Sequence, residues 1–150
     1  MALYEALMAE SESSPLIFKD LMASVGETLL VWGWLEVEIL KKLEASGHAL
    51  LPRVPPIQQW RIASARSAAD VSSWAVEIER AVQIRNRLAH GLVGGSAQPE
   101  EGEPFVVCRG VDGQFHTITL SLLKETVQSI DGLRRRLMSE PDDMLCPLQA

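Results

Sequence analysis

The chain has 150 residues, which is enough for one ordinary globular domain with one hydrophobic core. Its formal net charge of −6 argues against a surface that holds nucleic acid by bulk attraction, because each phosphate contact needs a lysine or an arginine. No stretch is long and apolar enough to cross a bilayer, and the N-terminus lacks the cationic start of a secretory signal. We therefore expect a single domain over residues 1–150, cytoplasmic and without a membrane partner.

The two cysteines, Cys108 and Cys146, lie far apart and in no metal-binding or redox spacing, so we interpret both as free thiols. The glycine-rich run "VGGSAQ" has neither the lysine nor the following helix of a P-loop. No HExxH motif or cluster of carboxylates suggests a metal. The sequence therefore predicts neither a metal nor a cofactor.

The first 16 residues are small, acidic and rich in serine, and we expect a short helical or frayed lead-in that breaks at Pro15. From residue 17 or 20 to about 46 the spacing of apolar residues is helical, and Gly47 is the expected C-cap. The apolar stripe of this helix consists of Leu29, Trp32, Leu40 and Leu43.

A proline-rich connection at 50–56 precedes a short predicted helix over 57–68. The next helix starts near Asp70 and runs to Gly91, which follows the last periodic residue. Residues 92–104 are rich in glycine and acids and show no periodicity, so we expect a mobile surface loop there.

The segment 105–120 is typical of a β-hairpin, because two β-rich runs flank Asp112-Gly113, a strong turn signal. Ser121 or Thr119 should cap a final helix. The apolar stripe of that helix consists of Leu123, Val127, Ile130 and Leu137.

The end of the chain, residues 140–150, should form a loose tail after Pro141. The basic run 134–136 on the final helix is interpreted as a solvated face. Together the elements predict an all-α fold, a small helical up-and-down bundle with a β-hairpin inserted before the last helix.

One arginine falls on an apolar stripe. In the helix before Gly91 the stripe leads at constant spacing to Arg85, and an unpaired buried guanidinium is costly. Arg85 should therefore meet an acid or face a cleft or interface. Glu36, in the middle of the first helix stripe, could be that acid, so a buried Glu36–Arg85 salt bridge and an Arg85 directed into a cleft both stay open. The stripe before Arg85 consists of Val71, Ala75, Ile78 and Val82.

The polar face next to this stripe carries Asn86 and, one turn later, His90. A guanidinium can hold phosphate oxygens bidentately, and a histidine with a pKa near ~6.5 can exchange protons at neutral pH. Arg85, Asn86, Arg87 and His90 are thus candidates for cleaving a phosphodiester without a metal. The alternative for His90 is a cap at the helix end, where a cation is favoured.

The segment "RNRLAH", residues 85–90, resembles the R-x4-6-H signature of the HEPN superfamily, the higher eukaryote and prokaryote nucleotide-binding domains. Asn86 is similar to the polar residue, often asparagine, that commonly follows the arginine of that motif. The run "GWLEVEIL" resembles the apolar first helix of several such families. The resemblance implies a HEPN-like bundle of α-helices.

In this family the arginine and histidine commonly form the active site of metal-independent endoribonucleases, which act as toxins or anti-phage effectors. The resemblance implies that His90 is the acid/base residue and that Arg85 stabilises the pentacovalent phosphorane. Asn86 and Arg87 would position the RNA, and Glu36 would support Arg85. The 2′-hydroxyl would attack its own 3′-phosphate to leave a 2′,3′-cyclic phosphate, a step that DNA cannot undergo.

The transfer needs both a base and an acid, and one motif offers one histidine. A homodimer with a composite active site would supply two, and an antitoxin protein would be a further partner. His48 and His116 could supply the second group in a monomer, although we interpret both as ordinary surface histidines. The alternative functions are a non-catalytic HEPN-like module that binds a protein or nucleotide or dimerises, and an unrelated helical interaction protein.

Overall fold

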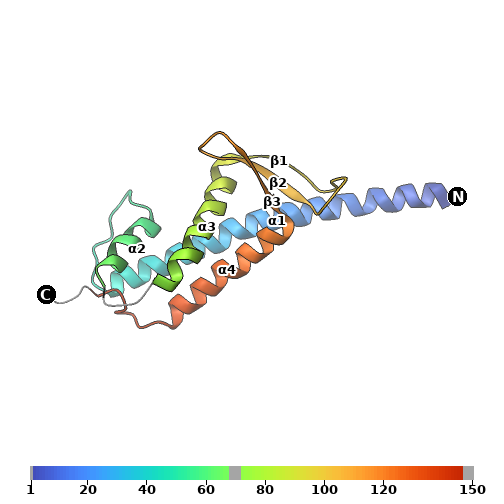
Figure 1. The fold of residues 1–150 in the computed structure, drawn as a ribbon. Helices are drawn as coiled ribbons and strands as arrows, with labels where there is room; N and C mark the ends of the chain where they lie inside the picture. The colour runs from blue at the N-terminus through green and yellow to red at the C-terminus, as the bar shows by residue number, and fades with distance from the viewer. Residues whose placement is uncertain (1, 68–71, 147–150) are drawn as a thin grey trace. The chain divides into compact units, whose positions relative to one another are not determined.

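The computed structural model describes residues 2–67 and 72–146 (Figure 1). Within these ranges the three strands form one antiparallel sheet in the order β1-β2-β3. The elements, in chain order, are α1 (Ala2–Ala45), α2 (Pro56–Ala65), α3 (Ser72–Gly91), β1 (Leu92–Ser96), β2 (Phe105–Arg109), β3 (Phe115–Thr119) and α4 (Leu120–Ser139).

The all-α prediction is wrong, because the fold combines helices with a three-stranded sheet. The predicted hairpin is present as β2 and β3, but β1 occupies the start of the segment expected to be a loop. Its sequence, "LVGGS", has no alternation of polar and apolar residues, so pattern alone did not reveal it. A Cβ on Gly95 would lie 2.6 Å from the carbonyl oxygen of Phe105, so the glycine lets the two strands pair closely.

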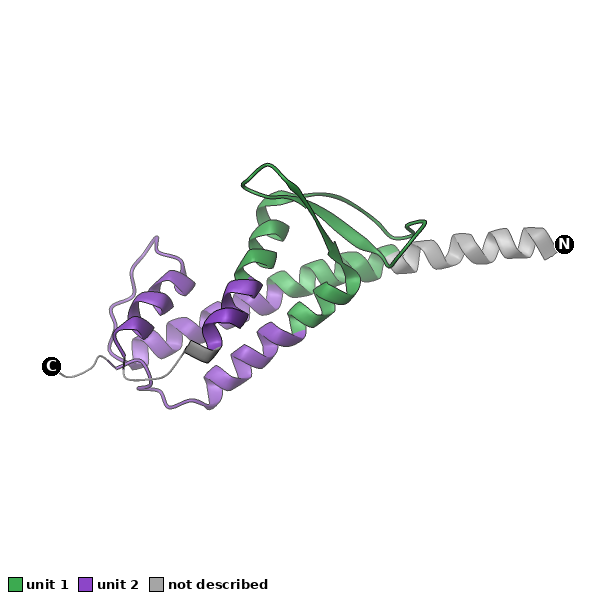
Figure 2. Cartoon of the chain, viewed as in Figure 1, with its two compact units in different colours: residues 1–29, 82–127 green, residues 30–81, 128–150 purple. Residues whose placement is uncertain are grey.

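The chain folds as two compact units (Figure 2). Unit 1 comprises Met1–Leu29 and Val82–Val127, and unit 2 comprises Leu30–Ala81 and Gln128–Ala150. The single domain expected over residues 1–150 stays a prediction. No helix in the described ranges combines the length and the apolar character needed to cross a membrane.

In unit 1 one face of the sheet is buried in an apolar core with parts of α1, α3 and α4. Alternate residues of the hairpin, Val106, Cys108 and Ile118, contribute to this core, as the two-residue period of a strand requires. The core also contains Leu21, Val25, Ile84, Leu88 and Leu123.

The turn and cap predicted around the hairpin are confirmed. Gly113 has a φ of 78°, and the N–H of Gln114 donates to Oδ1 of Asp112 over 2.9 Å. Thr119 is the N-cap of α4, because its Oγ1 accepts from the N–H of Leu122. Ser121 is not the cap; its N–H and hydroxyl both donate to the carboxylate of Glu103.

In unit 2, α2 and the C-cap at Gly47 are confirmed. Gly47 has a φ of 81°, and the N–H of His48 donates to the carbonyl of Leu43, as in a Schellman motif. Trp60 of α2 stacks on Trp74 of α3 with ring centroids 5.8 Å apart.

Arg135 and Arg136 of the basic run on α4 are exposed, as predicted, and the run also makes contacts within unit 2. Arg134 and Arg135 both contact the carboxylate of Asp131. These contacts lower the pKa of Asp131, and the hydrogen bond from Arg134 has the largest effect. The guanidinium of Arg136 lies 4.7 Å from the ring centroid of Trp74. These contacts hold the run on the helix surface.

Two predictions about the ends of the chain are wrong. α1 continues through Pro15 from Ala2, so there is no break there. The expected tail is held over residues 140–146, because Nζ of the buried Lys42 donates to the carbonyl of Glu140 and to Asp142. Leu145 is fully buried, and its carbonyl bonds to His48, so the segment packs by both apolar and polar contacts.

Candidate active site

A cavity of about 650 Å³ lies in unit 1 between the C-terminal end of α3 and the hairpin. α3 contributes one wall, the start of β1 a second, and the β2–β3 turn a third. A volume of this size is typical of sites that take small molecules or parts of larger ligands. The polar side chains that line it are Gln83, Asn86, Arg87, His90, Arg109, Asp112 and His116.

The structure brings together three of the predicted site residues, Asn86, Arg87 and His90, on this wall of α3. Arg85 does not line the cavity. Its Nη1 donates to Oδ1 of Asn86 over 2.9 Å, so Arg85 affects the cavity only by holding the side chain of Asn86. Glu36 belongs to unit 2 and Arg85 to unit 1, so their pairing stays a prediction.

Arg85 is off the core stripe, contrary to the sequence prediction. Each helical position advances by about 100°, and the larger apolar side chains decide which direction is buried. Arg85 lies at the edge of this direction and is half-buried, whereas Ala75 of the predicted stripe is exposed. The buried line of α3 consists of Trp74, Ile78, Ala81, Ile84 and Leu88.

Gly91 ends α3, as predicted, and it also permits a close contact with β2. α3 ends at Gly91 and β1 follows at once, without a left-handed residue between them. A Cβ at Gly91 would lie 2.2 Å from the carbonyl oxygen of Arg109, so only glycine lets the helix end lie against the backbone of β2. This contact brings His90 and the hairpin to the same cavity.

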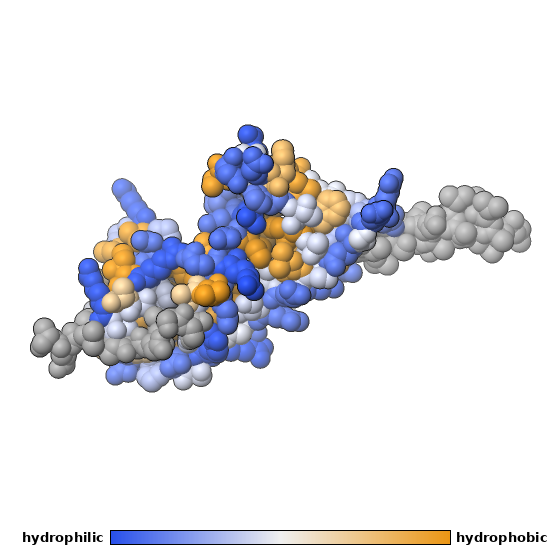
Figure 3. Space-filling view, in the orientation of Figure 1, coloured by the Kyte–Doolittle hydropathy of each residue, from blue (hydrophilic) through white to orange (hydrophobic). Residues whose placement is uncertain are grey.

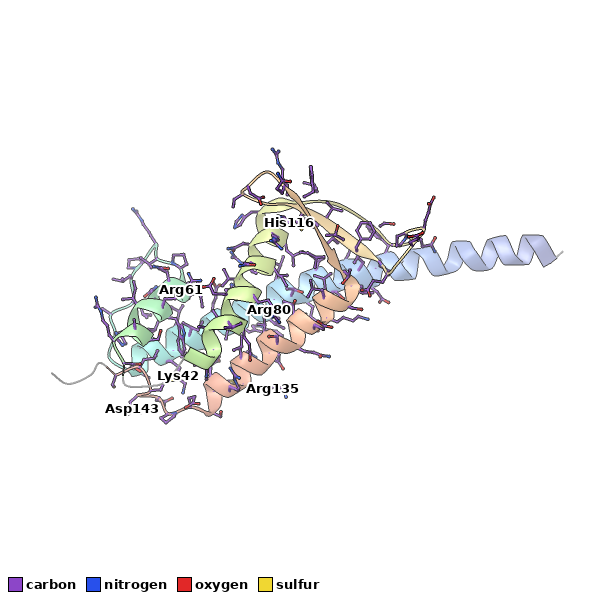
Figure 4. All side chains as sticks on the ribbon, viewed as in Figure 1. Lys42, Arg61, Arg80, His116, Arg135 and Asp143 are labelled. Carbon is purple, nitrogen blue, oxygen red and sulfur yellow. The ribbon has the colours of Figure 1, made fainter. Side chains whose placement is uncertain are left out.

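On the opposite wall, His116 of β3 faces the cavity from beside the C-terminal end of α3 (Figure 4). Its Nε2 lies 3.6 Å from Oδ1 of Asp112. The side chain of His116 is 28% exposed, so it is reachable from solvent without being free in it. The hydrogen bond from the Gln114 N–H has the largest effect in lowering the pKa of Asp112, and His116 lowers it further. The carboxylate therefore stays ionised.

The cavity carries a local positive charge on an acidic chain. Arg87 and Arg109 contribute two guanidinium groups against the single carboxylate of Asp112. Burial raises the pKa of the nearby Cys108 thiol, an effect that the Arg87 guanidinium opposes in part. Cys108 and Cys146 are free thiols, as predicted.

Part of the cavity lining is apolar, and apolar side chains lie among hydrophilic ones on the surface of the molecule (Figure 3). Leu92, Val93 and Val111 line the cavity yet are strongly exposed, and Phe115 next to the turn is 68% exposed. Apolar side chains beside cationic ones suit a ligand that carries both a charged group and a flat apolar surface. In the described part of the chain, no three histidine, cysteine or carboxylate side chains gather as metal ligands would.

Sequence reasoning did not place Arg109, Asp112 or His116 in the site. For His116 the sequence alone indicates no more than a histidine that could supply a second acid/base group. The available signal was the alternation along β3: His116 is two residues from the buried Ile118 and pairs with the buried Cys108, so it belongs to the inward face. The hairpin register had to be known before that signal could be used.

Comparison of the chain with protein-family models, with curated proteins and with solved structures found no match.

Proposed function

We propose that this chain is a metal-independent endoribonuclease of the HEPN type and that the cavity of unit 1 is its active site. The observation that carries the proposal is that His90 shares one cavity with two guanidinium groups, those of Arg87 and Arg109. A phosphodiester needs cationic donors for its oxygens and a titratable group for proton transfer, and both are present.

Arg87 and Arg109 approach the cavity from different elements, α3 and the end of β2. Two guanidinium groups on opposite walls suit the non-bridging oxygens of one phosphate and the charge that develops on them during attack. Asn86, held by Arg85, contributes an amide to the same wall. In this proposal Arg85 positions Asn86 and does not contact the phosphorane itself, which differs from the role that the family resemblance implies.

RNA is the proposed substrate because the reaction uses the 2′-hydroxyl as nucleophile. A toxin or an anti-phage effector is the biological role that the resemblance supplies, with an antitoxin protein as partner in the first case. A homodimer stays part of the proposal through that resemblance alone, because the cavity of one unit already contains two histidines.

The test is cleavage of mixed-sequence single-stranded RNA by the purified chain in EDTA, with the DNA of the same sequence as control. We expect RNA fragments that end in a 2′,3′-cyclic phosphate and no cut in DNA, both read by mass spectrometry. His90→Ala should reduce the rate by about 10²–10⁴-fold, the usual share of one acid/base group. Intact RNA with the wild-type chain would contradict the proposal.

Binding without cleavage is the outcome that favours the non-catalytic alternative. The same RNA is titrated against the wild-type chain and against Arg109→Ala. If RNA binds, if the variant weakens binding, and if neither chain cuts, the cavity is a nucleotide-binding site rather than an active site.

A further inference from the structure

We propose that His116 is the second acid/base group of this site, acting as general base on the 2′-hydroxyl, with Asp112 as its positioning residue. This inference rests on the proposed ribonuclease function. It makes the site complete within one chain, with His90 as the general acid on the other wall.

The geometry selects which nitrogen of His116 reacts. Oδ1 of Asp112 lies beside Nε2, at 3.6 Å, and an ionised carboxylate can only accept a hydrogen bond. In the proposal the neutral ring carries its proton on Nε2, beside this carboxylate, and the lone pair on Nδ1 takes the proton of the substrate. A histidine held in this tautomer by a carboxylate is the arrangement that a general base requires.

The backbone fixes this pair against the turn. A Cβ at Gly110 would lie 2.6 Å from Oδ1 of Asp112 and 2.9 Å from Nε2 of His116. The two side chains therefore pack against the space that a side chain at Gly110 would fill. The turn itself is closed by the bond from the Gly110 N–H to the carbonyl of Gln114, 2.8 Å long. Strand pairing between Cys108 and His116 sets the position of the ring along β3.

The proton and bond changes balance without a co-reactant. Nδ1 of His116 takes the proton of the 2′-hydroxyl, and the 2′-oxygen forms a bond to phosphorus. The bond from phosphorus to the 5′-oxygen breaks, and protonated His90 gives its proton to that leaving oxygen. The products are a 2′,3′-cyclic phosphate and a 5′-hydroxyl, and exchange with water restores both histidines.

His90 suits the acid role. It lies in the last turn of α3 and lines the cavity across from the hairpin. The charged and titratable groups that face His116 in the cavity are Asp112 and Arg109 of the hairpin and Arg87 and His90 of α3, with the Cys108 thiol across the strand pair.

The experiment is the pH profile of RNA cleavage in EDTA for the wild-type chain, His116→Ala and His116→Gln. We expect both variants to lose about 10²–10⁴-fold in rate and to lose the rise of activity with pH, because that rise reports the base. Added imidazole should restore part of the rate of His116→Ala, a result that a structural role would not give. Asp112→Asn should lower the rate less than His116→Ala.

The matched control is Thr117→Ala, since Thr117 is exposed, adjacent on β3 and outside the cavity lining. Thermal unfolding is measured for every variant. Cleavage by folded His116→Ala within about threefold of wild type, while His90→Ala is inactive, would overturn the role of His116 and leave the ribonuclease proposal standing. RNA left intact by the wild-type chain would overturn both.

Discussion

The carboxylate of Asp112 and the imidazole of His116 lie 3.6 Å apart across the β2–β3 turn, and both are held against Gly110. The pair depends on the absence of one methyl group. Gly110 does not have the positive φ that would exclude other residues. A glycine is needed here because a Cβ would collide with the side chains of Asp112 and His116. A substitution here therefore tests the geometry of the pair while every charge is retained.

Gly110→Ala should displace the two side chains and reduce RNA cleavage at least tenfold, because the three atoms nearest to the added carbon are side-chain tips, Oδ1 of Asp112 and two ring atoms of His116. These tips can rotate away, so the unfolding midpoint should change little. The chemical shifts of the His116 ring, followed by NMR, should move without RNA present. Unchanged shifts and unchanged cleavage would show that the pair tolerates the methyl group.

Arg87→Ala and Arg109→Ala should each weaken the binding of single-stranded RNA and lower its dependence on salt. One fewer phosphate contact reduces the slope of log K against log salt by about 0.7 for a single strand. The measurement is fluorescence anisotropy across a salt series. Arg66→Ala removes an exposed arginine of unit 2 and serves as the control. If Arg66→Ala changes the slope of log K against log salt as much as the cavity variants do, the RNA does not bind specifically at the cavity.

Local signals in the sequence predicted the hairpin but not the third strand. Asp112-Gly113 fixes its own turn through bonds made within five residues, so the prediction needed no distant contact. β1 depends on its partner, since "LVGGS" is a strand only because β2 supplies the hydrogen bonds. The ordered position of residues 140–146 was likewise not predictable from local sequence, because it depends on Lys42, which is far away in the chain.

The site divides in the same way. Asn86, Arg87 and His90 were predicted because they lie on one helix at helical spacing, which the sequence states directly. Arg109 and His116 reach the cavity through strand register and through the close approach of Gly91 to β2, which are properties of the folded chain. The error at Arg85 came from a stripe displaced by one residue, since Ile84 takes the buried direction.

Acid should weaken unit 1 through Glu103. The N–H and then the hydroxyl of Ser121 lower the pKa of this carboxyl from its ordinary value of 4.5, because they bond to the charged form. A carboxyl with a lowered folded-state pKa contributes stability above its ordinary value, and the contribution is lost as the pH falls through the lowered one. The wild-type chain should thus be more stable than Glu103→Gln at pH 7.

The difference between these two chains should shrink as the pH drops below 4.5 and then disappear, when measured by urea unfolding across pH. Glu101→Gln, in the same exposed loop, is the control for the loss of one charge. A difference that stays constant down to strong acid would mean that the ionised form of Glu103 is not what holds the start of α4.

Lys42→Met should destabilise unit 2 and free residues 140–146. The side chain of Lys42 is only 6% exposed, and its ammonium donates over 2.5 Å to the carbonyl of Glu140 and over 3.0 Å to Asp142. A hydrogen bond that involves a charged group contributes about 1.5–3 kcal/mol, which is the loss expected in urea unfolding. Asp142→Ala should cost only about 0–1 kcal/mol, because that carboxylate is largely exposed. Equal losses would assign the effect to the ion pair instead of the carbonyl.

Gly91→Ala should destabilise the chain, although alanine is ordinarily the better helix former by about 1 kcal/mol. The added carbon would lie 2.2 Å from the carbonyl oxygen of Arg109 and 3.1 Å from its carbon, and backbone atoms cannot rotate away. Overpacking of this kind costs about 1–3 kcal/mol, measured as the free energy of unfolding in urea. Gly94→Ala, on β1 with no atom within 4 Å of the new carbon, is the matched control and should be neutral or stabilising by up to about 1 kcal/mol.

Since the contact between Gly91 and β2 holds His90 beside the hairpin, Gly91→Ala should also lower cleavage below that of Gly94→Ala at a temperature where both are folded. If Gly91→Ala is as stable as Gly94→Ala, the end of α3 does not lie against β2, and the shared cavity of His90 and His116 loses its basis.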